Sequence, residues 1–183
     1  MAKKNMATEE FKRLVGAVPD DKAEHRLMFR LLACGFRTNE LVALKVKWIN
    51  FQGATIFIPA EVAKNKKDRH VVFPDSIYAS LYDQQEYREK DDYLFTQERF
   101  KDKPLSTRWI RKIFDEYQTK AGLEGYSPHS LRHYAAETMV RNKIPVNFIQ
   151  QQLGHSSLNT TMIYLSNSLD ERRHVIRSSN FEV

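Results

Sequence analysis

The spacing of apolar residues predicts helices along most of the chain. The most apolar of these segments ends at Gly35 and follows Asp20 and Asp21, whose negative charges suit the start of a helix. Its inward-facing residues are expected to be Leu27, Met28, Leu31 and Leu32. We expect this helix to be central in the fold.

Further helices are expected on both sides of it. Thr8 is a predicted cap for a helix that ends near Gly16, Thr38 for a short one over residues 39–44, and Ser106 for one that runs to Lys120. Asp75 begins another, with Ile77, Leu81 and either Tyr78 or Tyr82 facing inward. The remaining elements are expected over residues 129–142, 145–153, 160–164 and 169–176.

One part of the chain favours β-strands instead. Residues 55–58 and 70–73 are rich in β-branched and aromatic residues, and the basic segment 63–69 between them predicts a hairpin with a charged tip. A further strand near residues 46–49, joined through a turn at 50–53, completes a sheet. The predicted fold class is therefore α+β, mainly α-helical with a small three-stranded antiparallel sheet.

The length of 183 residues fits one domain with its own core, and no repeat or linker divides the chain. We therefore expect a single domain over residues 1–183, in which residues 177–183 form a tail that is loose or docked on a partner subunit. The one cysteine, Cys34, lies in an apolar run and indicates burial in a reducing cytosol. We find no membrane-spanning or targeting segment, which predicts a cytoplasmic protein.

The formal net charge of +6 favours a polyanion such as DNA, although many basic proteins bind none. Basic and hydroxyl groups recur in four separate segments. Residues 35–41 read GFRTNEL, residues 127–133 read SPHSLRH, residues 153–157 read LGHSS, and residues 160–164 read TTMIY. Singly, each such side chain is more often an ordinary helix or salt-bridge residue.

Together these segments resemble the tyrosine recombinase (phage integrase) family. Its strand-breaking site uses an arginine, a lysine, a His-x-x-Arg group, a late histidine or tryptophan, and a tyrosine, in that chain order. The positions that match are Arg37, Lys64, His129, Arg132, His155 and Tyr164. The resemblance implies the catalytic-domain fold of that family and no cofactor or metal.

The resemblance also implies a mechanism for breaking a phosphodiester. Tyr164 is expected to attack the phosphorus, and the guanidinium forks of Arg37 and Arg132 to hold its oxygens in a grip that lysine cannot reproduce. His129 would exchange a proton with the tyrosine or bind the phosphate, and His155 would donate to a non-bridging oxygen. The product is a 3′-phosphotyrosine that conserves the bond energy.

Two further residues are expected to support the site indirectly. Glu40, one turn after Arg37, can orient an arginine or a histidine. His133 stands four residues after His129, but the metalloprotease pattern needs a glutamate where Ser130 stands, so we interpret His133 as a supporting helix histidine.

The hairpin tip matches the family pattern Gly-Lys-Gly-x-Lys-x-Arg without its glycines. Lys64 takes the place of the first lysine and is expected to give a proton to the leaving 5′ oxygen, with Lys66 and Lys67 as rivals. Lys66, Lys67 and Arg69 are expected to contact DNA. A solvated, purely structural tip is the ordinary reading of such a segment.

The predicted function is site-specific recombination or integration of double-stranded DNA in a prokaryotic, nucleoid-associated setting. The resemblance implies a homotetramer on DNA that is possibly monomeric when free. Only 36 residues precede Arg37, so the helical core-binding domain of typical members is expected to be absent, either because the chain is an excised catalytic half or because it is a compact member. The competing functions are a type IB topoisomerase and a non-catalytic DNA-binding protein of the same fold.

Overall fold

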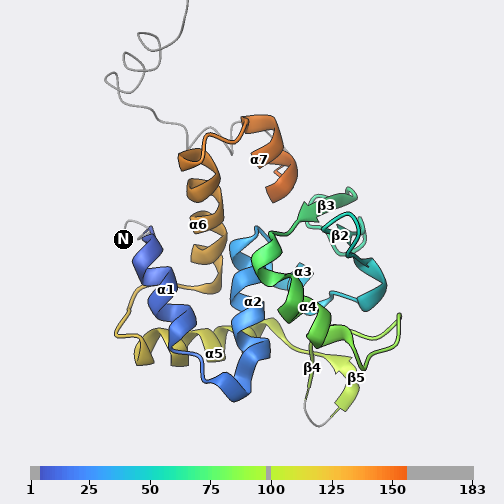
Figure 1. Cartoon of the computed structure of the whole chain (residues 1–183), viewed down its shortest axis with the longest axis horizontal. Helices are drawn as coiled ribbons and strands as arrows, with labels where there is room; N and C mark the ends of the chain where they lie inside the picture. Colours follow the sequence, from blue (N-terminus) through green and yellow to red (C-terminus); the bar gives the residue numbers. More distant parts are fainter. Residues whose placement is uncertain (1–4, 98–99, 156–183) are drawn as a thin grey trace, which may run out of the picture.

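The computed structural model describes residues 5–97 and 100–155, so Tyr164, the predicted elements at residues 160–164 and 169–176, and the tail at 177–183 lie outside the described residues. The central helix is α2 (Ala23–Ala33), as predicted, preceded by the 3-10 turn η1 (Asp20–Lys22). It packs against α6 (Pro128–Arg141) and α1 (Thr8–Gly16), with α5 (Thr107–Lys120) beneath them in Figure 1.

The apolar spacing of α2 determines its place in the core. The four residues predicted to face inward are all buried, and so are two neighbours on the same helix, His25 and Phe29. The Phe29 ring lies edge-on to Phe114 of α5, at 5.6 Å between centroids. The core around α2 therefore holds α5 and α6 at fixed positions, and the candidate site depends on their first turns.

The N-termini of α1 and α3 (Thr38–Val42) differ from the prediction in the same way. Thr8 and Thr38 are the first helical residues, and Ala7 and Arg37 are the N-caps. In each case a glutamate three residues after the cap accepts a hydrogen bond from the cap's backbone N–H, as Glu40 Oε2 does from Arg37 at 2.7 Å. The Ser106 cap is confirmed, since its hydroxyl accepts from Trp109 N at 3.1 Å.

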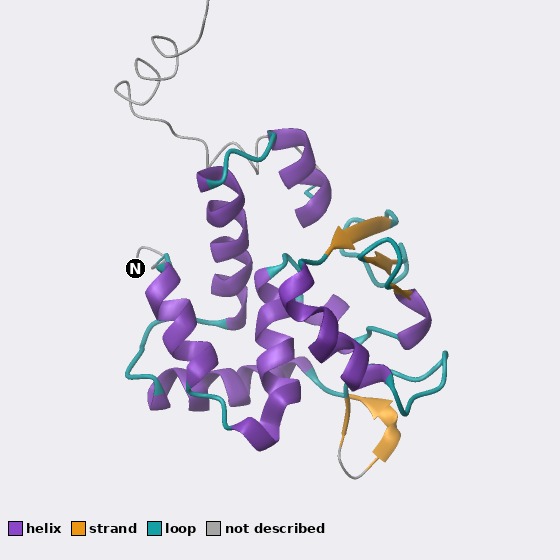
Figure 2. Ribbon diagram, in the orientation of Figure 1, coloured by secondary structure: helices purple, strands orange, loops and turns teal. Residues whose placement is uncertain are grey.

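The predicted three-stranded antiparallel sheet is confirmed, with the order β1 (Ile49–Asn50), β2 (Thr55–Ile58) and β3 (Arg69–Val72) (Figure 2). The first strand was predicted too early. The segment Val46–Trp48 is a 3-10 turn (η2), because the N–H groups of Val46 and Lys47 bond to the carbonyls of Asp92 and Lys90 and not to β2. Only Ile49 and Asn50 pair with β2.

The region after the sheet contains one confirmed helix and one hairpin that was not predicted. The turn η3 (Asp75–Ile77) leads into α4 (Tyr78–Gln85), where Ile77 and Leu81 are buried as expected. The inward orientation predicted for Tyr78 or Tyr82 is wrong, because both side chains are exposed. Their rings lie edge-on to Phe51, and that of Tyr78 also approaches Phe73. The strands β4 (Thr96–Gln97) and β5 (Phe100–Pro104) form a second hairpin, whose sequence lacks an apolar alternation.

The last described helix, α7 (Val146–Leu153), packs against both α6 and β3 (Figure 1). It is short, and its buried residues are Ile149 and Leu153. Among the described residues, no helix is long and apolar enough to cross a membrane.

Candidate functional site

Three arginines from three different elements meet at the last turn of α7. Arg37 comes from the turn between α2 and α3, Arg69 from the start of β3, and Arg132 from α6. Each guanidinium donates a hydrogen bond to a main-chain carbonyl of this turn. Arg69 donates to the carbonyl oxygen of Gln152, Arg132 to that of Leu153, and Arg37 to that of Gly154.

This convergence has a physical cause in the helix end. The last carbonyls of a helix have no partner within it and carry the negative end of the helix dipole, so cations are favoured there. Gly154 closes α7 with a left-handed φ of 58°. A Cβ on Gly154 would lie 2.5 Å from Arg69 Cδ, so glycine allows the arginine to approach.

Glu40 neutralises part of this positive charge from beneath. Its side chain is fully buried and accepts hydrogen bonds from Arg37 Nη1 at 3.0 Å and from Arg69 Nη2 at 2.5 Å. Burial alone would raise the pKa of the Glu40 carboxyl, but its interactions with Arg69 and Arg37 outweigh burial and hold that pKa below its ordinary value. Glu40 is therefore ionised at neutral pH and fixes both guanidinium groups.

Arg69 does not lie at the exposed tip of the hairpin, where it was predicted. It is only 7% exposed, and besides Glu40 and Gln152 its guanidinium reaches the carbonyl of Gly35 at 3.4 Å. The reason is its position at the first residue of β3, which packs against α7. Nη1 and Nη2 of Arg69 donate to protein acceptors, whereas its Nε has no hydrogen-bond partner within the described part of the chain.

Arg132 is equally buried, at 4% exposed. Its Nη1 donates to the carbonyl of Gly35 and its Nη2 to that of Leu153. The same Gly35 carbonyl thus receives Arg69 and Arg132, and the backbone runs on from it to Arg37 two residues later. The structure therefore brings Arg132 together with Arg37 and Glu40, which lie far from it in the sequence.

His155 follows Gly154 directly and is half-buried beside the arginines. Gln150 holds its main chain on both sides, by accepting from His155 N at 3.1 Å and donating to His155 O at 3.2 Å. Burial, and then the positive charges of Arg132, Arg37 and Arg69, lower the pKa of the His155 imidazole to about 4. The ring is neutral at pH 7, with one nitrogen as donor and the other as acceptor.

The three lysines of the hairpin tip, Lys64, Lys66 and Lys67, are exposed. A hollow of about 440 Å³ separates the tip from the end of α7. Lys67 lines it from the hairpin, and Gly154 and His155 line it from α7. Of the three lysines, Lys67 is the one that lines this hollow.

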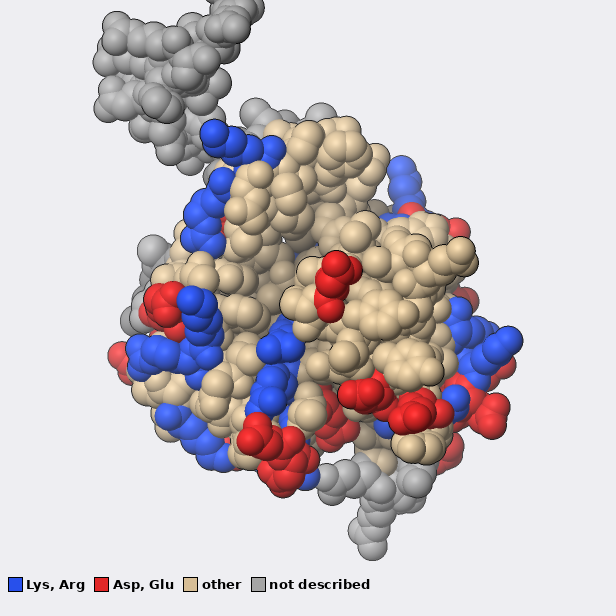
Figure 3. Space-filling model, in the orientation of Figure 1, with Lys and Arg blue, Asp and Glu red and all other residues tan. Residues whose placement is uncertain are grey.

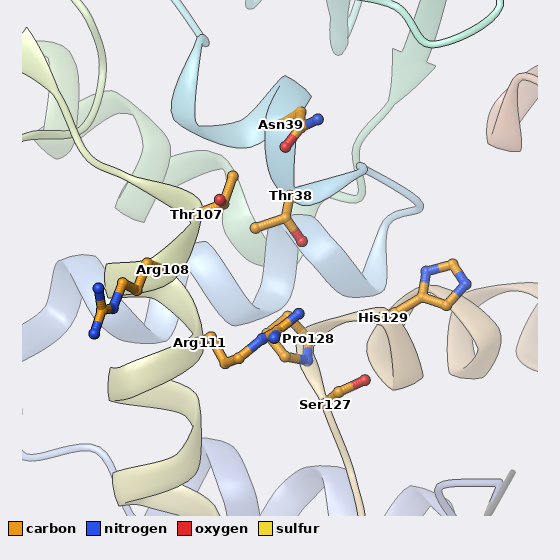
Figure 4. A pocket seen from close by; sticks show the side chains of 8 residues that line it. All are labelled: Thr38, Asn39, Thr107, Arg108, Arg111, Ser127, Pro128 and His129. Atoms are coloured by element: carbon orange, nitrogen blue, oxygen red, sulfur yellow. The ribbon is translucent and has the colours of Figure 1, made fainter.

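His129 lies in the first turn of α6 and is exposed, with its ring 4.5 Å from that of His133 and nearly perpendicular to it. It borders a second hollow of about 360 Å³, shown in Figure 4. The other residues around this hollow come from the first turns of α3 and α5 and from the start of α6: Thr38, Asn39, Thr107, Arg108, Arg111, Ser127 and Pro128. Hydroxyl, guanidinium and imidazole groups thus surround one space.

Arg108 and Arg111 were not predicted from the sequence as site residues. Their signal was a pair of arginines three residues apart, in the first turns of an amphipathic helix with a serine cap. That pattern is common on solvated helix faces. Only the packing of α5 beside α3 and α6 places the pair next to His129.

A third hollow, of about 630 Å³, is different in character. It lies between α6, α7 and β3, and three exposed apolar side chains border it: Val72, Ile144 and Phe148. On the face seen in Figure 3, uncharged atoms cover α7, whereas Lys and Arg side chains lie at the upper end of α6. A polyanion therefore fits the two basic hollows better than this one.

No group of three or more histidine, cysteine, aspartate or glutamate side chains in the described residues is arranged to hold a metal ion.

Comparisons with known proteins place this geometry in a family. The chain is 35% identical to the tyrosine recombinase XerA of Pyrococcus furiosus over 180 residues, which cover 97% of this chain and 62% of that protein. It is 33% identical to the tyrosine recombinase XerC of Leptospira interrogans over 155 residues, or 82% of this chain and 48% of the other. The chain thus spans about half to three-fifths of the length of these relatives.

Solved structures agree. A crystal structure of XerA recombinase matches 98% of this chain and 64% of its own, with a TM-score of 0.77 and 28% identity. The XerH site-specific recombinase bound to its difH substrate matches 97% of this chain and 55% of its own, with a TM-score of 0.78 and 25% identity. The predicted catalytic-domain fold is confirmed. Since the family model described as "Phage integrase family" matches residues 4–171, the chain belongs to the phage integrase family of tyrosine recombinases.

Proposed function

We propose that this chain is the catalytic domain of a site-specific tyrosine recombinase, which cleaves double-stranded DNA through a 3′-phosphotyrosyl intermediate on Tyr164 and rejoins it without a metal or cofactor. The observation that carries the proposal is the meeting of Arg37, Arg132 and His155 at the end of α7. The family membership and the recombinase relatives support it.

Arg37 and Arg132 are proposed to hold the scissile phosphate. A guanidinium group carries five N–H donors and stays charged at any pH that the protein tolerates. Arg37 directs Nη1 to Glu40 and Nη2 to Gly154, which leaves further N–H donors for a phosphate oxygen. The anchors on Glu40 and α7 also fix the guanidinium plane before DNA arrives, so binding needs little reorganisation.

His155 is proposed to donate a hydrogen bond to a non-bridging oxygen as a neutral imidazole. Its low pKa suits this role, because a neutral ring adds no further charge among three arginines. An anionic phosphate placed against the ring would stabilise the protonated form and raise the pKa. His155 would then report directly on occupation of the site.

In an NMR titration of the free protein, we expect the His155 ring to titrate near pH 4. Because the same ring has an ordinary pKa of 6.5 in the unfolded chain, protons favour unfolding, and this group lowers the stability as the pH falls from 6.5 toward 4. Adding duplex DNA to the Tyr164→Phe variant should move the midpoint upward. A midpoint above 6 in the free protein would contradict the proposed environment.

The remaining proposed roles rest on the family resemblance and on the two basic hollows. Lys64 is proposed as the general acid for the leaving 5′ oxygen, and Lys67, which lines the hollow beside His155, is its best-placed rival. His129 is proposed to exchange a proton with Tyr164, with His133 packed against it. Arg108 and Arg111, on the other side of His129, are proposed to contact neighbouring backbone phosphates.

The proposed partners are double-stranded DNA and further copies of the chain. We propose that residues 1–183 act as one catalytic domain, that four copies assemble on two DNA sites, and that one pair of strands is exchanged at a time. A type IB topoisomerase would share the chemistry but relax supercoils as a monomer. The relatives reported above are recombinases, which favours the first function.

The test is recovery of detergent-resistant protein–DNA adducts from a pool of genomic and random DNA in EDTA. We expect adducts with the wild type and none with Tyr164→Phe, at nearly unchanged DNA affinity. Tyr87→Phe is the matched control, because Tyr87 is 91% exposed and should lose nothing. Sequencing the trapped DNA should show one preferred site, whereas scattered sites with rapid plasmid relaxation would indicate a topoisomerase.

Two outcomes would contradict the proposal. Equal adduct yields from wild type and Tyr164→Phe would exclude Tyr164 as the nucleophile. Strong DNA binding by the wild type with no adduct on any DNA would indicate a binding protein.

A further inference from the structure

The side chain of Gln152 makes three hydrogen bonds that join separate elements. Its Oε1 accepts from Val72 N at 3.0 Å, and its Nε2 donates to Val72 O at 2.8 Å and to Cys34 O at 2.9 Å. Val72 is the last residue of β3, which lies at the edge of the sheet, and Cys34 caps the C-terminus of α2. The carboxamide therefore takes the place of a neighbouring strand at the sheet edge and also ties that edge to α2.

The main chain of the same residue belongs to the arginine site. The carbonyl of Gln152 accepts from Arg69, and the next two carbonyls accept from Arg132 and Arg37. His155 follows one residue later. A single residue thus holds the sheet and α2 through its side chain and begins the row of arginine acceptors through its backbone.

The apolar contacts of α7 are few. The helix has eight residues, of which Ile149 and Leu153 are buried. The hydrogen bonds at the end of α7 add to the constraint that these two side chains supply.

We propose that Gln152 is a positioning residue of the strand-cleaving site, which holds the last turn of α7 in register with Arg37, Arg132 and His155. It touches no substrate group in this arrangement. The inference rests on the proposed function, because it concerns the rate of strand cleavage. It predicts a large effect on cleavage and a small one on DNA affinity, since misplacement by about 1 Å can cost on the order of 100-fold in rate.

The carboxamide is the group that this position requires. Val72 offers one donor and one acceptor, and Cys34 offers a second acceptor, so the side chain needs two N–H donors and one oxygen at the same end. Glutamate has the same shape but presents a carboxylate to two carbonyl oxygens. Methionine has a similar length but makes none of these bonds.

The experiment compares Gln152→Glu and Gln152→Met with Asn147→Asp and Asn147→Leu. Asn147 is an exposed carboxamide residue on the same helix and lines neither basic hollow, so its variants reproduce the change in charge or polarity without the contacts. Three quantities are measured for each protein that melts cooperatively: the single-turnover rate of adduct formation at saturating DNA, the dissociation constant for DNA, and the pKa of His155 by NMR.

For both Gln152 variants we expect the adduct rate to fall about 10- to 100-fold and the dissociation constant to change less than about threefold. In Gln152→Met the pKa of His155 should rise from about 4 toward 6.5, because a loosened turn admits water to the ring. The rate of Gln152→Glu relative to wild type should recover on acidification, since a protonated carboxyl can again donate to a carbonyl. The Asn147 variants should match the wild type.

Adduct rates within twofold of wild type in both folded Gln152 variants would overturn the inference. A lowered melting temperature with an unchanged His155 pKa would also overturn it, since that result describes a merely structural residue. If the wild type itself forms no adduct, the proposed function fails, while the His155 pKa still tests whether Gln152 positions this turn.

Discussion

Replacing Glu40 by leucine is expected to lower the free energy of unfolding by about 3–5 kcal/mol, the usual cost of removing one partner from a buried ion pair. Glu40 is fully buried and is the carboxylate that Arg37 and Arg69 share. Without it, two guanidinium groups, one of them deeply buried, face each other without an intervening negative charge. Urea unfolding at pH 7, followed by circular dichroism, measures the loss.

The matched control is Glu116→Leu. Glu116 also pairs with a cation, Lys120 at 2.7 Å, but this pair lies on the surface of α5. Surface pairs contribute little to stability because solvent screens them, so the control should unfold close to the wild type. Equal losses of unfolding free energy in the two variants would show that the burial of Glu40 adds nothing to the stability that its ion pairs provide.

The effect of Glu40 should also depend on pH in a defined direction. The pKa of its carboxyl is lowered in the fold, so the unfolded chain binds a proton more readily than the folded one. The stability that Glu40 contributes is therefore complete above the unfolded value of 4.5 and is lost as the pH falls through the folded pKa. The difference in the free energy of unfolding between wild type and Glu40→Leu should be constant from pH 7 to 5 and become smaller below pH 5. A difference that grows on acidification would contradict a lowered pKa of Glu40.

The rate of DNA cleavage in Glu40→Leu should fall by more than the loss of stability alone explains. Glu40 holds Arg37 through both its backbone N–H and its Nη1. In Glu40→Leu the folded fraction should therefore form adducts on the order of 100-fold more slowly, because Arg37, the proposed phosphate-binding arginine, has lost its orientation.

The predictions that held depended on local patterns. The apolar spacing around Leu31 predicted the central helix correctly, and the β-branched and aromatic residues at 55–58 predicted the sheet. The expected position of Arg37 on a turn between two helices is confirmed for the same reason, since the Gly35 break and the start of α3 are both local. The resemblance to the family then supplied what local patterns cannot, namely that Arg37, Arg132 and His155 lie close together.

The errors arose where a distant partner decides the outcome. Arg69 looked like one more charge on a solvated hairpin, but its partners are Glu40, 29 residues earlier, and Gln152, 83 residues later. Gln152 gave no signal of its own among the three glutamines at 150–152, because its bonds depend on the sheet edge beside it. The prediction of a strand near residue 46 was wrong for the same reason, since the carbonyls of the loop at 90–92 bind the N–H groups of that segment.

The helix starts show a different kind of error, because their signal was in the sequence. Thr8 and Thr38 were chosen as caps for their hydroxyls, which are common at that position. The glutamates at positions 10 and 40 reach back by one more residue and make Ala7 and Arg37 the caps. At position 37 this matters for function, because the glutamate that caps the helix also binds the arginine side chain.

Replacing Gly154 by alanine is the second change for which we expect a large effect. The residue has a left-handed φ of 58°, which costs a non-glycine residue about 1 kcal/mol. The added Cβ would also lie 2.5 Å from Arg69 Cδ and 2.9 Å from Arg69 Nε. Because Arg69 is buried and tied to Glu40 and Gln152, it cannot swing aside as a surface side chain would. We expect a total loss of about 2–4 kcal/mol in urea unfolding, from strain and overpacking together.

Two glycines of the same chain separate these contributions. Gly125 has a φ of 80° but open space around it, so Gly125→Ala measures the backbone strain alone. Gly16 has neither a left-handed φ nor a neighbour within 4 Å, so Gly16→Ala should be neutral or stabilising by up to about 1 kcal/mol. The difference between Gly154→Ala and Gly125→Ala then isolates the collision with Arg69.

The same comparison of variants, made on the rate of adduct formation, tests the site itself. Gly154→Ala should form adducts at least 10-fold more slowly, since moving Arg69 disturbs Glu40 and through it Arg37. Gly125→Ala should keep the wild-type rate. Equal rates in the two variants would mean that the close approach of Arg69 to the end of α7 has no part in strand cleavage.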